Sequence, residues 1–189
     1  PQHKEEAVSV GDPRMFYIMG RAHCGSTFLD VVLGNVDGVE SVGEVTSGLK
    51  RGHAQMCSCG LRVGECPFWT DVAKNYREYS QGRDLFVDGA WLWKESDARK
   101  LPHALFTGLL RGGQRWEGYS KRQINLVAAI AETAHATAVL DSNKEYSRAI
   151  MLLKMRRDTK VIHLHRSPIT TLASRHHRVK EAGTGFRFM

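Results

Sequence analysis

Short apolar runs alternate with longer amphipathic stretches along much of this 189-residue chain. The runs at 15–19, 138–140 and 160–165 contain β-branched or aromatic residues, which is typical of buried parallel strands. Apolar residues at helical spacing predict four helices: from Ser26 or Thr27 to Gly34-Asn35, about 123–136, 146–155, and Pro168 to about 180. This alternation of strands and helices predicts an α/β fold with a central parallel sheet.

Three segments do not follow this pattern. Residues 1–14 are polar and contain Gly-Asp-Pro, which predicts a loose leader before one domain over 15–189. A chain of this length normally forms a single domain of ~100–200 residues. A short strand and a loop are predicted at 37–50. Residues 70–120 show no clear period and include an Arg-Gly-Gly at 111–113 that predicts a flexible loop.

The charge balance favours anionic partners. The chain has 27 Lys and Arg against 20 Asp and Glu, a formal net charge of +7. Such a balance suits nucleic acid, an acidic membrane or a phosphorylated small molecule. However, the sequence has no basic stripe interleaved with aromatic residues of the kind that binds nucleic acid. The longest apolar run, 126–131, is far shorter than the ~20 residues that a membrane helix needs. No signal-peptide pattern opens the sequence, so we expect a cytoplasmic protein without a membrane span or a nucleic-acid partner.

A candidate phosphate loop joins the first predicted strand to the first predicted helix. The segment from Gly20 to Thr27 reads G-x-x-x-x-G followed by Ser-Thr. This spacing lets backbone N–H groups and the helix N-terminus surround a phosphate. P-loop NTPases carry Lys directly after the second glycine, where this sequence has Ser26. The missing Lys argues against a triphosphate and for a single phosphate; the alternative is a plain strand-to-helix turn with two glycines.

A second candidate anion site follows the run at 160–165. Arg166 comes directly after this predicted strand, and Ser174 lies eight residues further along a helix that Pro168 can start. Ligands of open α/β sheets bind at the carboxyl ends of the strands. Arg166 as a planar fork and Ser174 as a neutral donor could together hold one more phosphate. Taken alone, the pair is more typical of a surface Arg and a helix Ser than of a phosphate site.

The two motifs together resemble the sulfotransferases that use 3′-phosphoadenosine 5′-phosphosulfate (PAPS). That family has a P-loop-like segment for the 5′-phosphosulfate, then an Arg-x-Pro with a Ser eight residues after the Arg for the 3′-phosphate. The resemblance covers about 14–70 and 137–180, and three further segments contribute to it: Asp141-Ser142-Asn143-Lys144, Cys57-Ser58-Cys59-Gly60 and Cys66-Pro67-Phe68-Trp69. It implies a three-layer, P-loop NTPase-like domain with a central parallel sheet.

The resemblance also implies an activity. PAPS would be the cofactor, and its sulfuryl group would pass by in-line displacement to a hydroxyl or amine of a small-molecule or carbohydrate acceptor, leaving 3′,5′-adenosine bisphosphate (PAP). Family members continue well past the second motif, so part of the pocket can lie outside these 189 residues. The implied cofactor-binding residues are Gly20, Arg21, Ala22, His23, Cys24, Gly25, Ser26, Thr27, Phe28, Arg166 and Ser174.

Sulfuryl transfer needs a base for the acceptor and a cation for the departing phosphate oxygen. Many family members have Lys or Arg before the Ser-Gly of the loop, where this chain has His23, so we expect His23 as the cation and Arg21 as its substitute. Glu44 is the leading candidate for the base; the alternative is a solvated loop carboxylate. His53 is a weaker rival, and Lys144 is a tentative residue for the sulfate or the acceptor.

Three of the four cysteines lie close together in the sequence: Cys57, Cys59 and Cys66. With His53 they could supply four zinc ligands, but H-x3-C-x-C-x6-C is not the spacing of a standard zinc finger. A disulfide to Cys66 is a further alternative in an oxidising compartment. The preferred interpretation is a tight hairpin with buried thiols and no metal.

Two other functions remain open on the sequence alone. A P-loop nucleotide kinase or NTPase predicts binding of ATP with magnesium, against which the missing loop Lys argues. A basic nucleotide- or zinc-binding module without catalytic activity predicts binding but no transfer.

Overall fold

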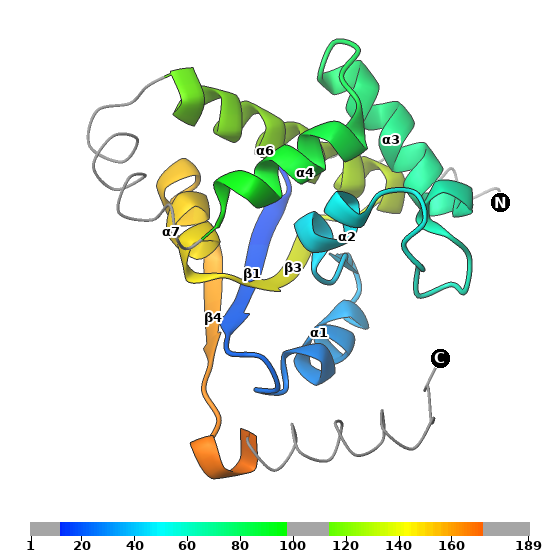
Figure 1. Cartoon of the computed structure of the whole chain (residues 1–189). Helices are drawn as coiled ribbons and strands as arrows, with labels where there is room; N and C mark the ends of the chain where they lie inside the picture. The colour runs from blue at the N-terminus through cyan, green and yellow to red at the C-terminus, as the bar shows by residue number, and fades with distance from the viewer. Residues whose placement is uncertain (1–11, 98–113, 172–189) are drawn as a thin grey trace, which may run out of the picture.

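The computed structural model describes residues 12–97 and 114–171 (Figure 1). The elements in these ranges are β1 (Arg14–Gly20), α1 (Ser26–Gly34), β2 (Val39–Ser41), α2 (Val45–Arg51), the 3-10 helix η1 (Val63–Glu65), α3 (Pro67–Tyr79), α4 (Leu85–Glu95), α6 (Gln114–Ala134), β3 (Ala138–Lys144), α7 (Tyr146–Met155) and β4 (Lys160–Leu164).

The four strands form one parallel sheet in the order β2-β3-β1-β4, so the predicted α/β class is confirmed. Gly20 at the end of β1 lies opposite Leu164 at the end of β4, and Met19 lies opposite Lys144 at the end of β3. Figure 1 shows β1 and β4 side by side with both arrowheads at one edge of the sheet. Loops that follow these strands therefore meet at this carboxyl edge.

Alternate residues of the central strands point to opposite faces of the sheet and pack against two different layers of helices. Met15, Tyr17 and Val139 belong to the core cluster that the sheet shares with α3, α4, α6 and α7. Ile18 and Leu140 point to the other face and are fully buried there, where α1 packs against β1, β2 and β3. Both faces of the central strands are covered, which explains why these strands read as continuous apolar runs.

A buried ion pair ties β3 to α7. Arg148 of α7 and Asp141 of β3 are both completely buried, and Nε and Nη2 of Arg148 lie 2.8 and 2.7 Å from Oδ2 of Asp141. The guanidinium also donates to Tyr119 Oη and Gln123 Oε1 on α6, each at 3.0 Å. One side chain thus joins the sheet and two helices.

A second buried carboxylate, Asp88 of α4, joins the outer helices. It accepts hydrogen bonds from Arg83, Arg122 of α6 and Tyr76 of α3 at 2.6–2.8 Å. Burial raises the pKa of Asp88, but these hydrogen bonds outweigh burial, so the pKa lies below its ordinary value.

Asp88→Asn is expected to lower the free energy of unfolding at neutral pH by about 1.5–3 kcal/mol, the typical contribution of hydrogen bonds to a charged group. Because the folded pKa is depressed, this stability is present above the unfolded value of about 3.9 and is lost as the pH falls through the lower folded value. Urea unfolding between pH 7 and 3 measures this loss. The variant should show a weaker acid dependence than the wild type; equal acid dependence would contradict the prediction.

The sequence located the strands better than the helices. The runs at 15–19, 138–140 and 160–165 fall on β1, β3 and β4, and α7 matches its predicted range. In contrast, α2, α3 and α4 were not predicted, and α6 begins at Gln114 instead of near Gln123. The expected leader at 1–14 extends into β1, while the expected loop at 111–113 lies outside the described residues.

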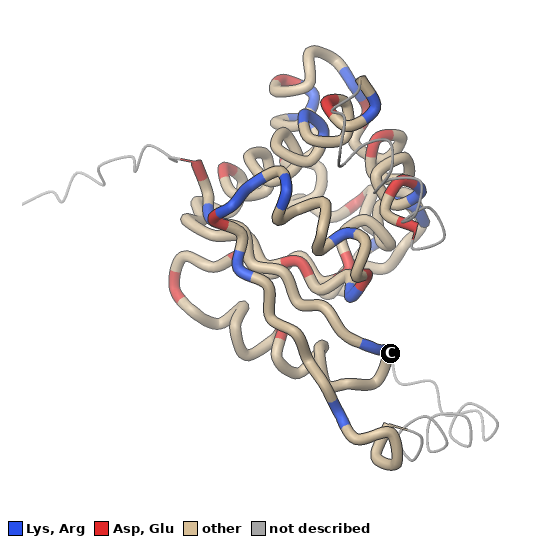
Figure 2. The backbone as a smooth tube through the Cα atoms, turned by 90° about the vertical axis from the view of Figure 1, so that its left-hand side faces the viewer, with Lys and Arg blue, Asp and Glu red and all other residues tan. Residues whose placement is uncertain are grey.

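The charges do not form a single basic surface in the view of Figure 2. Lys and Arg are interspersed there with Asp and Glu over the helices. Several are paired, among them Arg156 with Asp12 and Asp158, and Arg115 with Glu95. In the part of the chain that the structure describes, no helix is both long and apolar enough to cross a bilayer.

Candidate functional site

The candidate phosphate loop connects β1 to α1 at the carboxyl edge of the sheet. A Cβ atom at Gly20 would lie 2.7 Å from the Leu164 carbonyl oxygen, so only glycine allows β1 and β4 to approach this closely. Gly25 has φ 98° and is the N-cap of α1, again a conformation that favours glycine. The motif's two glycines are therefore explained by backbone geometry.

The first turn of α1 presents backbone donors at this edge. The first helical hydrogen bond runs from Leu29 N to Gly25 O at 3.1 Å, so the N–H groups of Ser26, Thr27 and Phe28 have no acceptor within the helix. Among the described residues, no side chain caps this helix. Ser26 is buried, whereas Thr27 and Phe28 are exposed. This arrangement suits an anion, because the free N–H groups add to the positive end of the helix dipole.

Arg166 and the phosphate loop, far apart in the sequence, meet in the structure. Arg166 Nη1 donates to the carbonyl oxygen of His23 at 3.3 Å. His23 has φ 66°, and its carbonyl contact with Arg166 connects the loop to the segment after β4. Arg21 is exposed in the same loop. Ser174, the other expected phosphate ligand, lies outside the described residues.

Glu44 and Lys144 form an ion pair at the same edge. Glu44 is the N-cap of α2, and Lys144 ends β3 in a left-handed conformation with φ 71°. Both side chains remain partly exposed, 44% for Glu44 and 20% for Lys144. The structure thus brings together the expected base and the tentative acceptor residue.

Asn143 holds α2 in the position that makes this ion pair possible. Its Oδ1 accepts from Thr46 Oγ1 at 3.1 Å and from Ser47 Oγ at 3.2 Å, while its Nδ2 donates to Asp141 Oδ1 at 2.6 Å. Asp141 in turn is held by Arg148. The sequence reasoning did not find this positioning role, although Asp141-Ser142-Asn143-Lys144 was the available signal.

A cavity of about 740 Å³ opens beside Glu44. It lies between the end of α1, β2, α2, the cysteine-containing loop and the start of α3, and Phe68 and Trp69 add aromatic surface to its wall. Asp30 and Glu40 also line it. Burial raises the pKa of both carboxyls. At Asp30, interactions with Ser41 and Ser142 lower the pKa but do not outweigh burial. The cavity therefore offers carboxyl groups and aromatic rings to a polar molecule of moderate size.

His53 and the tryptophans of the middle segment have packing roles. The His53 ring lies on Phe86, with ring centroids 3.8 Å apart, and does not line the cavity. Trp116 stacks on Tyr119, Trp91 carries the Arg122 guanidinium over its ring, and Lys50 lies over Trp93. The position of His53 therefore gives no support to its expected role as a second candidate for the base.

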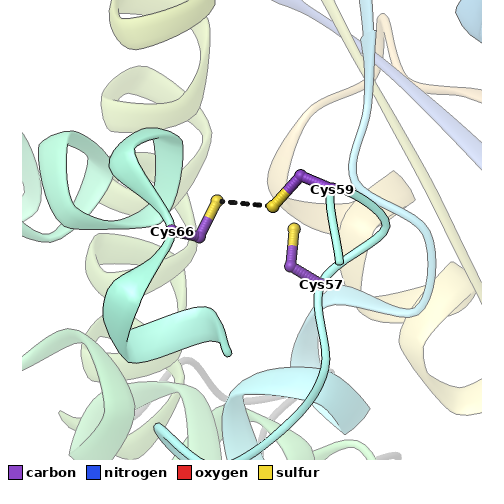
Figure 3. Close-up of side chains that lie close together, drawn as sticks. All are labelled: Cys57, Cys59 and Cys66. Atoms are coloured by element: carbon purple, nitrogen blue, oxygen red, sulfur yellow. Dashed lines mark hydrogen bonds between the residues drawn. The ribbon is translucent and has the colours of Figure 1, made fainter. Parts of the chain in front are cut away.

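The three cysteines line the same cavity. Their sulfur atoms lie close together (Figure 3). Their sulfur atoms all lie within 4.8 Å of one another, and Cys59 Sγ is 3.6 Å from Cys66 Sγ. Only Cys66 is buried; Cys57 is half-buried and Cys59 is exposed. Burial raises the pKa of Cys66, whereas hydrogen bonds to the Cys57 sulfur outweigh burial and lower its pKa.

No protein-family model, no curated protein and no solved structure matches this chain.

Proposed function

We propose that this chain binds PAPS in a P-loop-like, three-layer domain and transfers its sulfuryl group to a hydroxyl or amine acceptor. The observation that carries the proposal is the contact between Arg166 and the carbonyl of His23 at 3.3 Å. Two anion-binding motifs at opposite ends of the chain meet at one edge of the sheet. A ligand with two separated phosphate groups, such as PAPS, can bind to both motifs at once.

The cofactor's two anionic ends have different partners. The 5′-phosphosulfate binds the free N–H groups at the start of α1, with the hydroxyl of Thr27 as a further donor. Arg166 binds the 3′-phosphate through its planar fork of N–H groups. Ser26 in place of a P-loop Lys favours this single phosphate over the β- and γ-phosphates of ATP.

The transfer itself is an in-line displacement at sulfur. The Glu44 carboxylate takes the proton of the acceptor O–H or N–H as the acceptor atom bonds to sulfur. At the same time the bond between sulfur and the bridging phosphate oxygen breaks, and its electron pair leaves with PAP. His23 and Arg21 in the loop stabilise the charge on that oxygen. Lys144 orients Glu44 through the ion pair between them.

The cavity beside Glu44 is the place for the acceptor. Its volume of about 740 Å³ lies in the ordinary range for small-molecule sites. Carboxyl groups and aromatic rings in one cavity suit a sugar or an amine, because the ligand can donate hydrogen bonds to the carboxyl groups and pack its apolar face on the rings.

Titration with PAP tests the proposal. PAP is expected to bind more tightly than ATP with magnesium, and Arg166→Ala should weaken PAP binding by about 1.5–3 kcal/mol, roughly 10- to 150-fold, because a charged hydrogen-bond donor is lost. Calorimetry measures both constants. Arg77→Ala, which changes an exposed arginine on α3, is the matched control and should leave the affinity unchanged.

Two outcomes would overturn this function. A preference for ATP with magnesium would favour a P-loop kinase or NTPase. Equal loss of PAP affinity in the Arg166 and Arg77 variants would show that binding reflects general charge and not the proposed 3′-phosphate site.

A further inference from the structure

The three clustered cysteines come from two separate pieces of chain. Cys57 and Cys59 belong to a hairpin closed by a bridge between Met56 and Arg62, and Cys66 is the N-cap residue of α3. Figure 3 shows the three sulfur atoms turned toward one common space. Any ligand bound there would fasten the hairpin to α3.

The sulfur atoms have the spacing that a tetrahedral metal ion needs. Zn–S bonds of about 2.3 Å at tetrahedral angles place the sulfur atoms about 3.8 Å apart. Cys59 Sγ and Cys66 Sγ are 3.6 Å apart, and all three sulfur atoms lie within 4.8 Å of one another. A disulfide joins only two sulfur atoms at about 2.05 Å and would leave the third cysteine of the group without a role.

Backbone hydrogen bonds fix the hairpin that carries two of the sulfur atoms. The N–H of Cys57 donates to the Leu61 carbonyl oxygen at 2.8 Å. The hairpin turn places Gly60 at φ 86°, with its N–H bonded to the Cys57 carbonyl at 3.0 Å. These bonds hold Cys57 and Cys59 in one turn, with both sulfur atoms within 4.8 Å of that of Cys66.

We propose that Cys57, Cys59 and Cys66 bind one Zn²⁺ ion as three thiolates. On binding, three S–H groups release their protons to solvent and three Zn–S bonds form, without any change of oxidation state. Soft thiolate ligands in a tetrahedral arrangement select Zn²⁺ over the hard cations that prefer oxygen. The spacing of the sulfur atoms therefore changes the preference that the sequence had given to free thiols.

Three protein ligands leave one coordination position for water or another ligand. His53 does not supply the fourth ligand, because its ring packs on Phe86 and lies outside the sulfur cluster. All three cysteines line the cavity beside Glu44. The metal consequently forms part of the wall of that cavity, and its first role is to hold the hairpin and the start of α3 together.

Metal analysis of the full chain tests this site. Protein purified under reducing conditions, supplied with zinc sulfate and then dialysed, is expected to keep about one zinc per chain. Each ligand variant should bind zinc at least about 100-fold more weakly, since loss of an outer-shell partner alone typically costs 10- to 100-fold. Cys59→Ser is the most informative variant, because Cys59 is exposed and its replacement does not disturb the core.

Cys24→Ser and His53→Ala are the matched controls. Both should retain the wild-type zinc content, because Cys24 lies in the phosphate loop and His53 outside the sulfur cluster. Cobalt substitution adds a readout of ligand type, since thiolate-bound Co²⁺ gives charge-transfer absorption that Cys59→Ser should lose.

Three results would overturn the site: a zinc content near zero after reconstitution, equal retention in Cys59→Ser and the wild type, or a disulfide between two of these cysteines in the reduced preparation. PAP titration of Cys59→Ser is independent of these readouts, so failure of the zinc site and failure of the proposed sulfotransferase activity are distinguishable.

Discussion

Arg148→Met is expected to lower the free energy of unfolding by about 3–5 kcal/mol, the typical effect of removing one partner of a buried ion pair. The substitution removes the cation from the completely buried Asp141 and leaves Tyr119 and Gln123 without their donor. Such a loss is a large share of the 5–15 kcal/mol that holds a typical domain together.

Urea unfolding followed by circular dichroism measures this effect. Arg156→Met is the matched control: Arg156 also pairs with two carboxylates, but those of Asp12 and Asp158 are mostly exposed. Exposed pairs contribute about 1 kcal/mol or less. Equal destabilisation by the two variants would contradict the role of the buried pair.

The double variant Asp141→Asn/Arg148→Met separates charge from packing. If the unpaired buried carboxylate causes most of the loss, the double variant should regain part of the stability of Arg148→Met. No recovery would mean that the contacts of Arg148 with α6 account for the loss instead. The same network positions Asn143, so we also expect the Glu44–Lys144 ion pair to weaken in the single variant.

The sequence predicted those elements whose local pattern matches their environment. β1 and β3 are mostly buried on both faces and therefore appear as apolar runs, whereas β4 is a partly exposed strand at the edge of the sheet. α3 and α4 were missed although their starts carry recognisable signals: Pro67 at the first position of α3, and Asp84, whose side chain accepts from two backbone N–H groups at 2.9 Å. After Asp84, the aromatic residues Phe86, Trp91 and Trp93 are spread around α4 and obscure its helical period.

The site could be predicted only as far as single motifs reach. The spacing of the phosphate loop and the position of Arg166 after a strand were enough to place both at the carboxyl edge of the sheet. The pairing of Glu44 with Lys144 depends on α2, which was not predicted, and on Asn143, whose three side-chain partners come from two elements. Arg148 looked like any polar residue of an amphipathic helix, because burial of a charge depends on tertiary packing alone.

Glu44→Gln is expected to lower the rate of sulfuryl transfer by about 10²–10⁴-fold, the usual contribution of a general base. The amide keeps the size of the side chain but cannot accept the acceptor's proton. Labelled PAPS with a panel of phenols, sugars and amines measures the rate. PAP affinity should remain at the wild-type value, because Glu44 lies at α2 and not in the phosphate loop.

Two further carboxylates make this prediction specific. Glu78→Gln changes an exposed residue of α3 and should leave the rate unchanged. Glu40 lines the same cavity from β2. Of Glu40 and Glu44, Glu44 is the one that pairs with Lys144 at the end of β3. Full turnover in Glu44→Gln would remove Glu44 as the base. Loss of turnover in Glu40→Gln alone would transfer that role to β2, because the carboxylate that takes the proton must be the one that contacts the acceptor.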